Sequence, residues 1–260
     1  MNRRVRALFA FANKKAFPGY AWKLEQYLKT ECSSFVHVRK EGIKAMGRYG
    51  GQRRAMTGVI LAGGQNRRMG GQSKALLMYE GNTFLARQLT ELGSLCAELL
   101  IVTQEPERYE AVVHAFSGES PVRIIPDQQP GRGPLAGFQA AMRAASYEEL
   151  WIVGCDMPWV DAEAAKVLSE LRSSVGADAA VAKIDGRLHP LHGVYLKNCL
   201  SEAERLLAAN DLRLMGLLDS VALQVADESF LERKGISKGF IRNINDPDEY
   251  ERLTGKRLRF

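Results

Sequence analysis

The fold of this chain is decided by the stretch Val59-Ile60-Leu61-Ala62-Gly63-Gly64-Gln65-Asn66-Arg67-Arg68-Met69-Gly70, which is followed by Lys74. Its first four residues form a short apolar run, which is typical of a central parallel strand. The glycine pair allows a tight turn that can bring backbone N–H groups against phosphate oxygens. Because two arginines and Lys74 add positive charge, the stretch predicts a loop that holds a nucleoside triphosphate.

Two common phosphate-binding templates do not fit this loop. A Walker loop needs G-x-x-x-x-G-K-[ST], and here Ser73 stands directly before Lys74. A dinucleotide-binding loop needs G-x-G-x-x-G, which does not match the order of the glycines. The sequence therefore indicates a glycine loop of another kind.

From residue 58 onward, short apolar runs alternate with amphipathic stretches of helical length. This alternation predicts an α/β fold with a doubly wound, mostly parallel sheet and helices on both faces. We expect strands at 58–62, 98–103, 122–125, 149–155, 178–183, 190–196 and 240–244. We expect helices at 83–95, 105–116, 134–146, 161–173, 198–208, 211–218 and 246–254. Ligands bind such sheets at the carboxyl ends of strands, so motifs that directly follow strands are the first candidates for function.

A second motif runs from Ile124 to Gly137 and joins a strand that ends in Asp127 to a loop rich in glycine and proline. Pro134 suits the first turn of the helix that follows, whose N-terminal N–H groups would face a ligand. An ordinary strand-to-helix turn is the alternative, and glycine and proline alone would favour it.

The third motif is Leu150-Trp151-Ile152-Val153-Gly154-Cys155-Asp156-Met157-Pro158, a continuous apolar strand with a carboxylate at its carboxyl end. Such a carboxylate suits Mg²⁺, which binds one or two protein carboxylates and otherwise keeps water and phosphate oxygens. The alternative is that Asp156 caps the helix that follows. Asp161 is better placed for that cap, directly before Ala162, so we predict that Asp156 is available to a metal ion.

A fourth segment, Arg187 to Tyr195, contains His189 and His192. Residues three apart on a strand face opposite sides, so a metal ion shared by the two histidines is not expected. One solvated and one packed histidine is the alternative reading of the pair.

The last segment reads Ile-Arg-Asn-Ile-Asn-Asp-Pro-Asp-Glu-Tyr over residues 241–250. Helix initiation explains much of it, because Asp246 can cap, Pro247 suits the first helical position and Glu249 completes a capping box. Asn243 and Asn245 are not explained in this way.

The five segments, in this order, resemble those of the molybdenum cofactor guanylyltransferases, the MobA-type nucleotidyltransferases. The resemblance spans residues 57–260 and rests first on L-A-G-G-x-x-x-R-M-G-x-x-x-K, on G-P-L-A-G after Asp127, and on C-D-x-P. The H-P-L and N-I-N segments support it. The family often has Ser where this chain has Asn66, and Asp where it has Ser73.

The resemblance implies a Rossmann-like nucleotidyltransferase fold and roles for particular residues. It implies that catalysis rests on Lys74, Arg68 and Asp156. It implies that Asp156 also holds Mg²⁺. It implies that the nucleotide is bound by Leu61, Ala62, Gly63, Gly64, Lys74, Asp127 and Asp156. It implies that the acceptor is bound by His189, Asn243 and Asn245.

The implied reaction is the transfer of GMP from GTP to the terminal phosphate of molybdenum-molybdopterin, which forms molybdopterin guanine dinucleotide and releases pyrophosphate. The implied partners are GTP, molybdenum-molybdopterin, and molybdoenzymes or other proteins of cofactor biosynthesis. A cytidylyltransferase for the same cofactor and a sugar-phosphate nucleotidyltransferase are the enzyme alternatives. Gly63 favours guanosine, because cytidine-using relatives more often have Ala at this position.

An alternative from another class is a non-catalytic nucleotide-binding protein with a basic RNA-binding arm. Residues 1–56 carry 13 Lys and Arg against 3 Glu, whereas the whole 260-residue chain has a net charge of only +6. Clustered Lys and Arg attract phosphates without needing a fold. The joint presence of Lys74, Asp127 and Asp156 nevertheless argues against a dead enzyme, and no nucleic-acid partner is expected.

We predict a basic N-terminal extension over residues 1–56 and a nucleotidyltransferase domain over residues 57–260. Members of the resembled family usually begin just before the first strand. We therefore hypothesise that Met56 is the natural start, and that residues 1–55 are upstream sequence or a disordered arm.

The sequence contains no apolar stretch of 18 residues, so neither a transmembrane helix nor a membrane partner is expected. A short apolar run near the N-terminus is interrupted by Lys14 and Lys15 before a signal-peptide core can form. The four cysteines are dispersed without a C-x-x-C pair, which is typical of reduced thiols. We expect a cytoplasmic protein.

Overall fold

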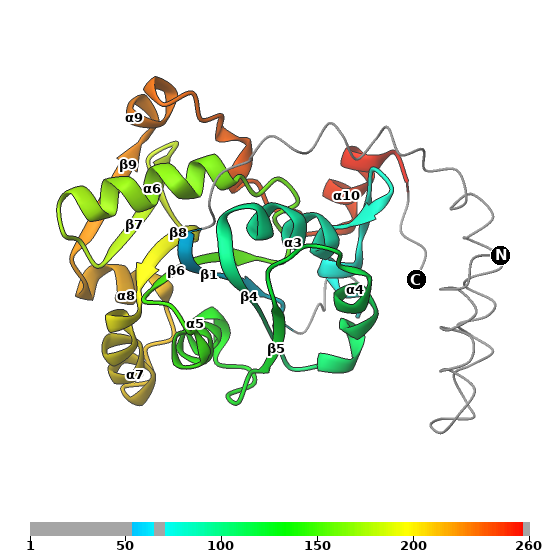
Figure 1. Ribbon diagram of the computed structural model, residues 1–260, viewed down its shortest axis with the longest axis horizontal. Coiled ribbons are helices and arrows are strands. Elements are labelled where there is room, and N and C mark those ends of the chain that lie inside the picture. The colour runs from blue at the N-terminus through cyan, green and yellow to red at the C-terminus, as the bar shows by residue number, and fades with distance from the viewer. Residues whose placement is uncertain (1–53, 65–70, 257–260) are drawn as a thin grey trace. The chain divides into compact units, whose positions relative to one another are not determined.

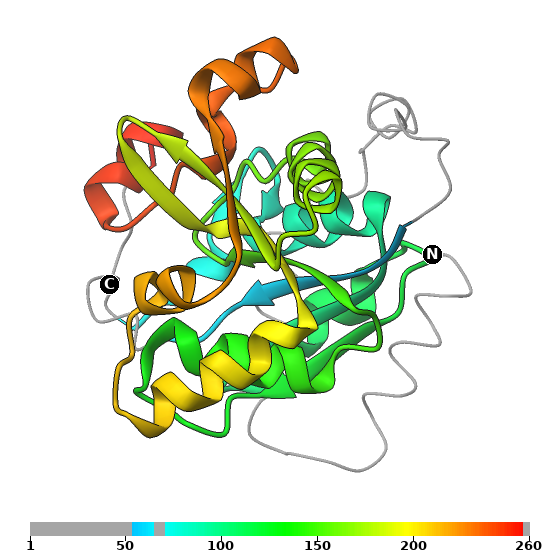
Figure 2. The same cartoon turned by 90° about the vertical axis from the view of Figure 1, so that its left-hand side faces the viewer.

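A twisted sheet carries helices on both of its faces in the computed structural model, which describes residues 54–64 and 71–256 (Figure 1; Figure 2 shows the same layers from the side). The prediction of a doubly wound, mostly parallel α/β sheet is confirmed. The first strand begins at Arg54, within the range 1–56 that we assigned to the extension. Residues 1–53 lie outside the described residues, so the division of the chain stays a prediction.

In the described residues the main sheet has seven strands in the order β5-β4-β1-β6-β8-β7-β9. Their bounds are β1 Arg54–Leu61, β4 Cys96–Thr103, β5 Val122–Pro126, β6 Glu149–Gly154, β7 Ala179–Ile184, β8 Arg187–Leu196 and β9 Leu223–Asp227. β8 is antiparallel to both of its neighbours, and the other pairings in this sheet are parallel. From β1 the chain proceeds to β4 and β5 on one side and then to β6 on the other. The strand order therefore reverses at β1, where a ligand site is expected.

Helices of the two faces enclose two separate cores. One face carries α3 (Phe84–Leu95), α4 (Glu110–Ala115) and α6 (Ala162–Ser174), and the other carries α5 (Gly133–Ala144), α7 (Leu200–Ala208) and α8 (Leu214–Ser220). Along β1, Ile60 packs into the first core, whereas Val59 and Leu61 pack into the second. Burial on both faces explains why this strand is an uninterrupted apolar run in the sequence.

The remaining elements are short and connect or follow the strands of the main sheet along the chain. A hairpin is formed by β2 (Met78–Tyr79) and β3 (Asn82–Thr83), and two further helices are α9 (Glu228–Arg233) and α10 (Pro247–Thr254). The described residues also contain the 3-10 helices η4 (Lys74–Leu76), η5 (Pro106–Arg108), η6 (Lys197–Cys199) and η7 (Lys238–Ile241). No helix in the described part is long and apolar enough to cross a membrane.

The predicted strand at 240–244 is wrong. Phe240 lies in η7, and residues 242–246 form neither helix nor strand. Phe240 packs on the ring of His192, with 4.5 Å between the ring centroids, and the Ile244 N–H donates to the carbonyl oxygen of Asp156 at 2.8 Å. Apolar side chains buried without a strand partner give the same short apolar pattern as a strand. β9 and α9 were not predicted from the sequence.

His192 is a fully buried histidine behind the loop that follows β6. Its ring lies between Trp151 and Phe240, with centroid distances of 5.0 and 4.5 Å. Its Nε2 accepts a hydrogen bond from the backbone N–H of Asp161 at 2.9 Å. Asp161 itself caps α6, as predicted, by accepting from the N–H groups of Glu163 and Ala164. Burial lowers the pKa of His192 to about 3, so the ring is neutral in the folded protein.

We expect His192 to make the free energy of unfolding fall as the pH is lowered from about 6.5 toward 3. In this window the unfolded chain binds a proton on the histidine and the folded chain does not. The contribution of neutral, buried His192 to the free energy of unfolding is therefore complete above pH 6.5 and is lost as the pH falls. Urea unfolding gives the free energy of unfolding of the wild type and of His192→Gln. The amount by which the wild-type value exceeds that of the variant should shrink by about 2 kcal/mol between pH 7 and pH 5. An advantage that does not change with pH would contradict this account.

Candidate active site

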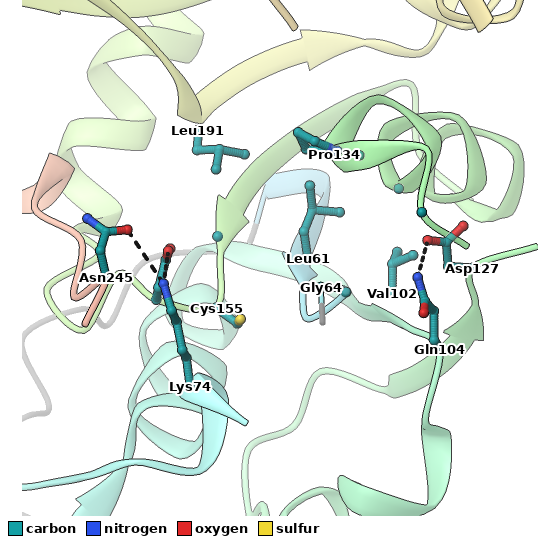
Figure 3. Close-up of a pocket in the computed structure, with 16 residues that line it drawn as sticks. Leu61, Gly64, Lys74, Val102, Gln104, Asp127, Pro134, Cys155, Leu191 and Asn245 are labelled. Carbon is teal, nitrogen blue, oxygen red and sulfur yellow. Dashed lines mark hydrogen bonds and ion pairs between the residues drawn. The ribbon is translucent and has the colours of Figure 1, made fainter. Parts of the chain in front are cut away.

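A pocket of about 610 Å³ lies at the carboxyl ends of β1, β4 and β6 (Figure 3). The register of the sheet places Leu61 level with Val102 on one side and with Gly154 on the other. The loops that follow these strands therefore meet around one opening. The pocket is lined by Leu61, Gly63, Gly64, Lys74, Val102, Gln104, Asp127, Gly131, Gly133, Pro134, Gly137, Gly154, Cys155, Asp156, Leu191 and Asn245.

The start of the glycine loop forms one wall. Leu61, Gly63 and Gly64 line the pocket, and Gly64 has a φ of 131°, a conformation that glycine adopts readily. Ala62 is buried and continues the sheet, because its N–H donates to the carbonyl oxygen of Val102 at 2.8 Å. Arg68, which the resemblance assigns to catalysis, lies outside the described residues.

Lys74, Asp156 and Asn245 meet at one end of the pocket, although they come from three distant segments of the chain. The Nζ of Lys74 lies 3.3 Å from Oδ2 of Asp156 and 3.5 Å from Oδ1 of Asn245. The side chains of Lys74 and Asp156 are 17% and 19% exposed. A cation and a carboxylate are thus held side by side in a partly desolvated site, where charges act more strongly than in water.

The turn that carries Asp156 is held from behind by buried groups. Gln88 of α3, fully buried, donates its Nε2 hydrogens to the carbonyl oxygens of Gly154 at 2.7 Å and Met157 at 2.9 Å. A Cβ on Gly154 would lie 2.8 Å from Oδ1 of Asp156, so the glycine leaves room for the carboxylate. Gln88 was not predicted, because nothing in the sequence distinguishes it from a glutamine on the surface of a helix.

Asp127 and Gln104 form the opposite end of the pocket. Oδ1 of Asp127 accepts from the backbone N–H of Gln129 at 3.0 Å, and Oδ2 lies 3.4 Å from Nε2 of Gln104. Asp127 was predicted as a site residue, whereas Gln104 was not. Because Gln104 directly follows the predicted strand 98–103, the rule that ligands bind at the carboxyl ends of strands could have found it.

The N-terminus of α5 forms another wall, to which Gly133, Pro134 and Gly137 contribute. Pro134 occupies the first turn of this helix, as predicted. Arg132, directly before the helix, donates from Nη2 to the carbonyl oxygen of Leu207 at 2.5 Å and so ties the loop to α7. The unpaired N–H groups and the dipole of a helix N-terminus favour a negatively charged ligand on this wall.

Of the three candidates for acceptor binding, only Asn245 lines the pocket. Asn243 is exposed, and His189 is half-buried in β8, from which Leu191 reaches the pocket instead.

The capping box at α10 also differs from the prediction. Asp246 caps the helix, but Oε2 of Glu249 accepts from the N–H of Asn245, at 2.6 Å, instead of that of the capping residue. The helix start thus helps to fix Asn245 at the pocket.

Asp156 is the residue whose chemistry suits a metal ion. Among the described residues no group of three or more His, Cys, Asp or Glu is placed to hold one. A carboxylate at one end of the pocket fits Mg²⁺, which takes one or two protein carboxylates and completes its shell with water and phosphate oxygens. Burial raises the pKa of the neighbouring Cys155 thiol to about 12, so this thiol stays protonated and makes a poor metal ligand.

Residues 58–224 match the model of one protein family, described as the MobA-like NTP transferase domain. The match begins in β1 and reaches β9, and so includes the glycine loop, the Asp127 loop and the Asp156 turn.

Two curated relatives and one solved structure agree with that match. A probable molybdenum cofactor guanylyltransferase of Carboxydothermus hydrogenoformans is 31% identical over 76% of this chain and 94% of its own length. A protein of the same description from Pelotomaculum thermopropionicum is 34% identical over 74% of this chain and 89% of its own length. The structure of molybdopterin-guanine dinucleotide biosynthesis protein A from Archaeoglobus fulgidus, 24% identical, has the same fold with a TM-score of 0.64, covering 77% of this chain and 97% of that one. The chain therefore belongs to the family of MobA-like NTP transferases, which includes curated molybdenum cofactor guanylyltransferases.

Proposed function

We propose that this protein transfers GMP from GTP to the terminal phosphate of molybdenum-molybdopterin, forming molybdopterin guanine dinucleotide and pyrophosphate. The observation that carries the proposal is similarity along 94% of the length of a probable guanylyltransferase of this kind. The pocket supports it, since about 610 Å³ lies within the range of roughly 300–1,000 Å³ common for small-molecule sites.

The triphosphate would lie between the glycine loop and the end of the pocket that Lys74 and Asp156 form. Backbone N–H groups at Gly63 and Gly64 would contact phosphate oxygens, and the Lys74 ammonium would offset their charge. Arg68 is proposed as a further cation on the same loop. Asp127 and Gln104, at the opposite end, offer carboxylate and amide groups that can bind the nucleoside by hydrogen bonds.

In this proposal the nucleophile is the terminal phosphate of the acceptor. It attacks the α-phosphorus of GTP, the bond to the β-phosphate oxygen breaks, and pyrophosphate leaves with the electron pair of that bond. The protein contributes positioning and charge neutralisation, and no covalent protein intermediate is required. One preorganised electrostatic contact of this kind is typically worth about 3 kcal/mol of the barrier.

Asp156 would hold Mg²⁺ on the triphosphate, as the chemistry of a partly buried carboxylate at this end of the pocket allows. When bound there, Mg²⁺ would neutralise negative charge on the phosphates. Lys74, 3.3 Å from the same carboxylate, would keep this part of the pocket balanced in charge.

The acceptor would approach from the side of Asn245, which lines the pocket beside Lys74. His189 and Asn243 remain acceptor residues by resemblance only. We further propose a cytoplasmic protein that passes its product to molybdoenzymes or other proteins of cofactor biosynthesis. Cys96, Cys155 and Cys199 are free thiols, which suits a reducing compartment.

We expect label from α-labelled GTP, and none from α-labelled CTP, to enter the pterin product when the protein is incubated with Mg²⁺ and molybdenum-loaded molybdopterin. Labelled product would be separated from nucleotide by chromatography. Label from CTP alone would assign the protein to cytidylyl transfer, and label from neither nucleotide would refute the proposed acceptor.

Asp156→Asn should lower kcat by about 10²–10³-fold, because the amide cannot replace the charge of the carboxylate. Asp161→Asn is the matched control. It makes the same change five residues away, at a helix cap that asparagine also serves. Steady-state transfer with saturating GTP measures both variants. Equal turnover of Asp156→Asn and the wild type would remove Asp156 from the mechanism.

Lys74→Met should raise the KM for GTP roughly tenfold or more, since it removes one charge-assisted contact to phosphate and keeps the length of the side chain. Lys166→Met removes a lysine that is paired with Glu163 on α6, away from the pocket, and should leave the KM unchanged. The measurement is the initial rate of transfer against GTP concentration. A similar KM in both variants would show that Lys74 does not contact the nucleotide.

A further inference from the structure

Tyr109 is a buried tyrosine that connects the two ends of the glycine loop. It lies between η5 and α4, and the residue is 1% exposed. Its hydroxyl oxygen is 2.8 Å from Oγ of Ser73 and 3.3 Å from the carbonyl oxygen of Ala62. Ala62 stands directly before Gly63, and Ser73 stands directly before Lys74. The Tyr109 hydroxyl thus contacts the two residues that flank the glycine loop, Ala62 before it and Ser73 after it.

The directions of these two hydrogen bonds follow from the groups involved. A carbonyl oxygen can only accept, so the Tyr109 hydroxyl donates its hydrogen to Ala62. The Ser73 hydroxyl must then donate to the oxygen of Tyr109. Burial raises the pKa of Tyr109, so the phenol keeps the proton that this chain of hydrogen bonds requires.

Ser73 does not serve the helix that it precedes. It occupies the N-cap position of η4, where a serine side chain commonly bonds to its own helix, yet it makes no such bond here. Its side chain is directed to Tyr109 instead, 36 residues away in the sequence. The start of η4, and with it Lys74, is therefore tied to Tyr109, directly before α4, and through Tyr109 to Ala62, directly after β1. Local helix capping does not explain these contacts.

We propose that Tyr109 is a positioning residue, whose hydroxyl fixes the two ends of the glycine loop and thereby holds Lys74 in place for the phosphates of the nucleotide. The proposal rests on the proposed function for the identity of that ligand. Lys74 reaches Asp156 from the first residue of η4, so a small shift of this short helix would displace the ammonium group. A displaced ammonium group would make a weaker charge-assisted contact with the phosphates of the bound nucleotide.

The test is Tyr109→Phe, which removes the hydroxyl and keeps the buried ring. The KM for GTP should rise roughly tenfold with a smaller change in kcat, as expected for the loss of one buried hydrogen bond that acts on nucleotide binding. Ser73→Ala should have a similar effect. The double variant should be little worse than either single variant, because both remove the same chain of hydrogen bonds.

Thr57→Val is the matched control. It also removes a buried hydroxyl, whose Oγ1 donates to Oε2 of Glu98 at 2.9 Å, but it lies toward the opposite end of β1 from the loop. It should leave the KM for GTP unchanged. An equal rise of KM in this control would show that the effect of Tyr109→Phe is a general loss of stability, and would overturn the proposal.

A second measurement uses the protein without any ligand. The amide hydrogens of Leu76 and Leu77, which bond to the carbonyl oxygens of Ser73 and Lys74, should exchange faster in Tyr109→Phe and at the wild-type rate in Thr57→Val. Wild-type exchange in Tyr109→Phe would overturn the proposal, as would faster exchange with an unchanged KM. If the wild type transfers no GMP, the proposed function fails, and the exchange rates still decide whether Tyr109 holds the loop.

Discussion

The parallel pairing of β4, β1 and β6 is the constraint on which the site depends. Leu61 is level with Val102 and with Gly154, and the hydrogen bonding continues one residue further on both sides, to Ala62 and Cys155. The glycine loop, Gln104 and the Asp156 turn therefore leave the sheet at one edge. A slip of one residue in either pairing would turn the side chains of that strand to the opposite face, and would separate the groups that line the pocket.

Charge at the pocket depends on segments that the sheet alone does not bring together. Lys74 belongs to η4, Asp156 follows β6, and Asn245 comes just before α10. The Nζ of Lys74 nevertheless lies 3.3 Å from Oδ2 of Asp156 and 3.5 Å from Oδ1 of Asn245. The backbone contact between Ile244 and Asp156, at 2.8 Å, fixes the last of these segments. This segment is held at the pocket without being a strand, by the buried side chain of Ile244 and by hydrogen bonds to Asp156 and Glu249.

Much of this arrangement could be predicted from the sequence, and the reason is geometric. Gly63, Asp127 and Asp156 each follow an apolar run, and runs that form neighbouring parallel strands end at the same edge. The caps at Asp161 and Asp246 were also predictable, since a cap bonds to N–H groups two or three residues away. The strand expected at 240–244 was wrong, because an apolar pattern reports burial and does not report the hydrogen-bond partner.

The sequence by itself determined the α/β framework, the order of the candidate nucleotide-binding motifs and the caps of α6 and α10, because these depend on short-range patterns. Only the tertiary structure decided which polar groups hold the site in place. Gln88 bonds to Gly154 across 66 residues, Tyr109 to Ala62 across 47 and His192 to Asp161 across 31. Such bonds have no periodicity in the sequence, since each depends on two elements that meet only when the cores on both faces of the sheet are packed.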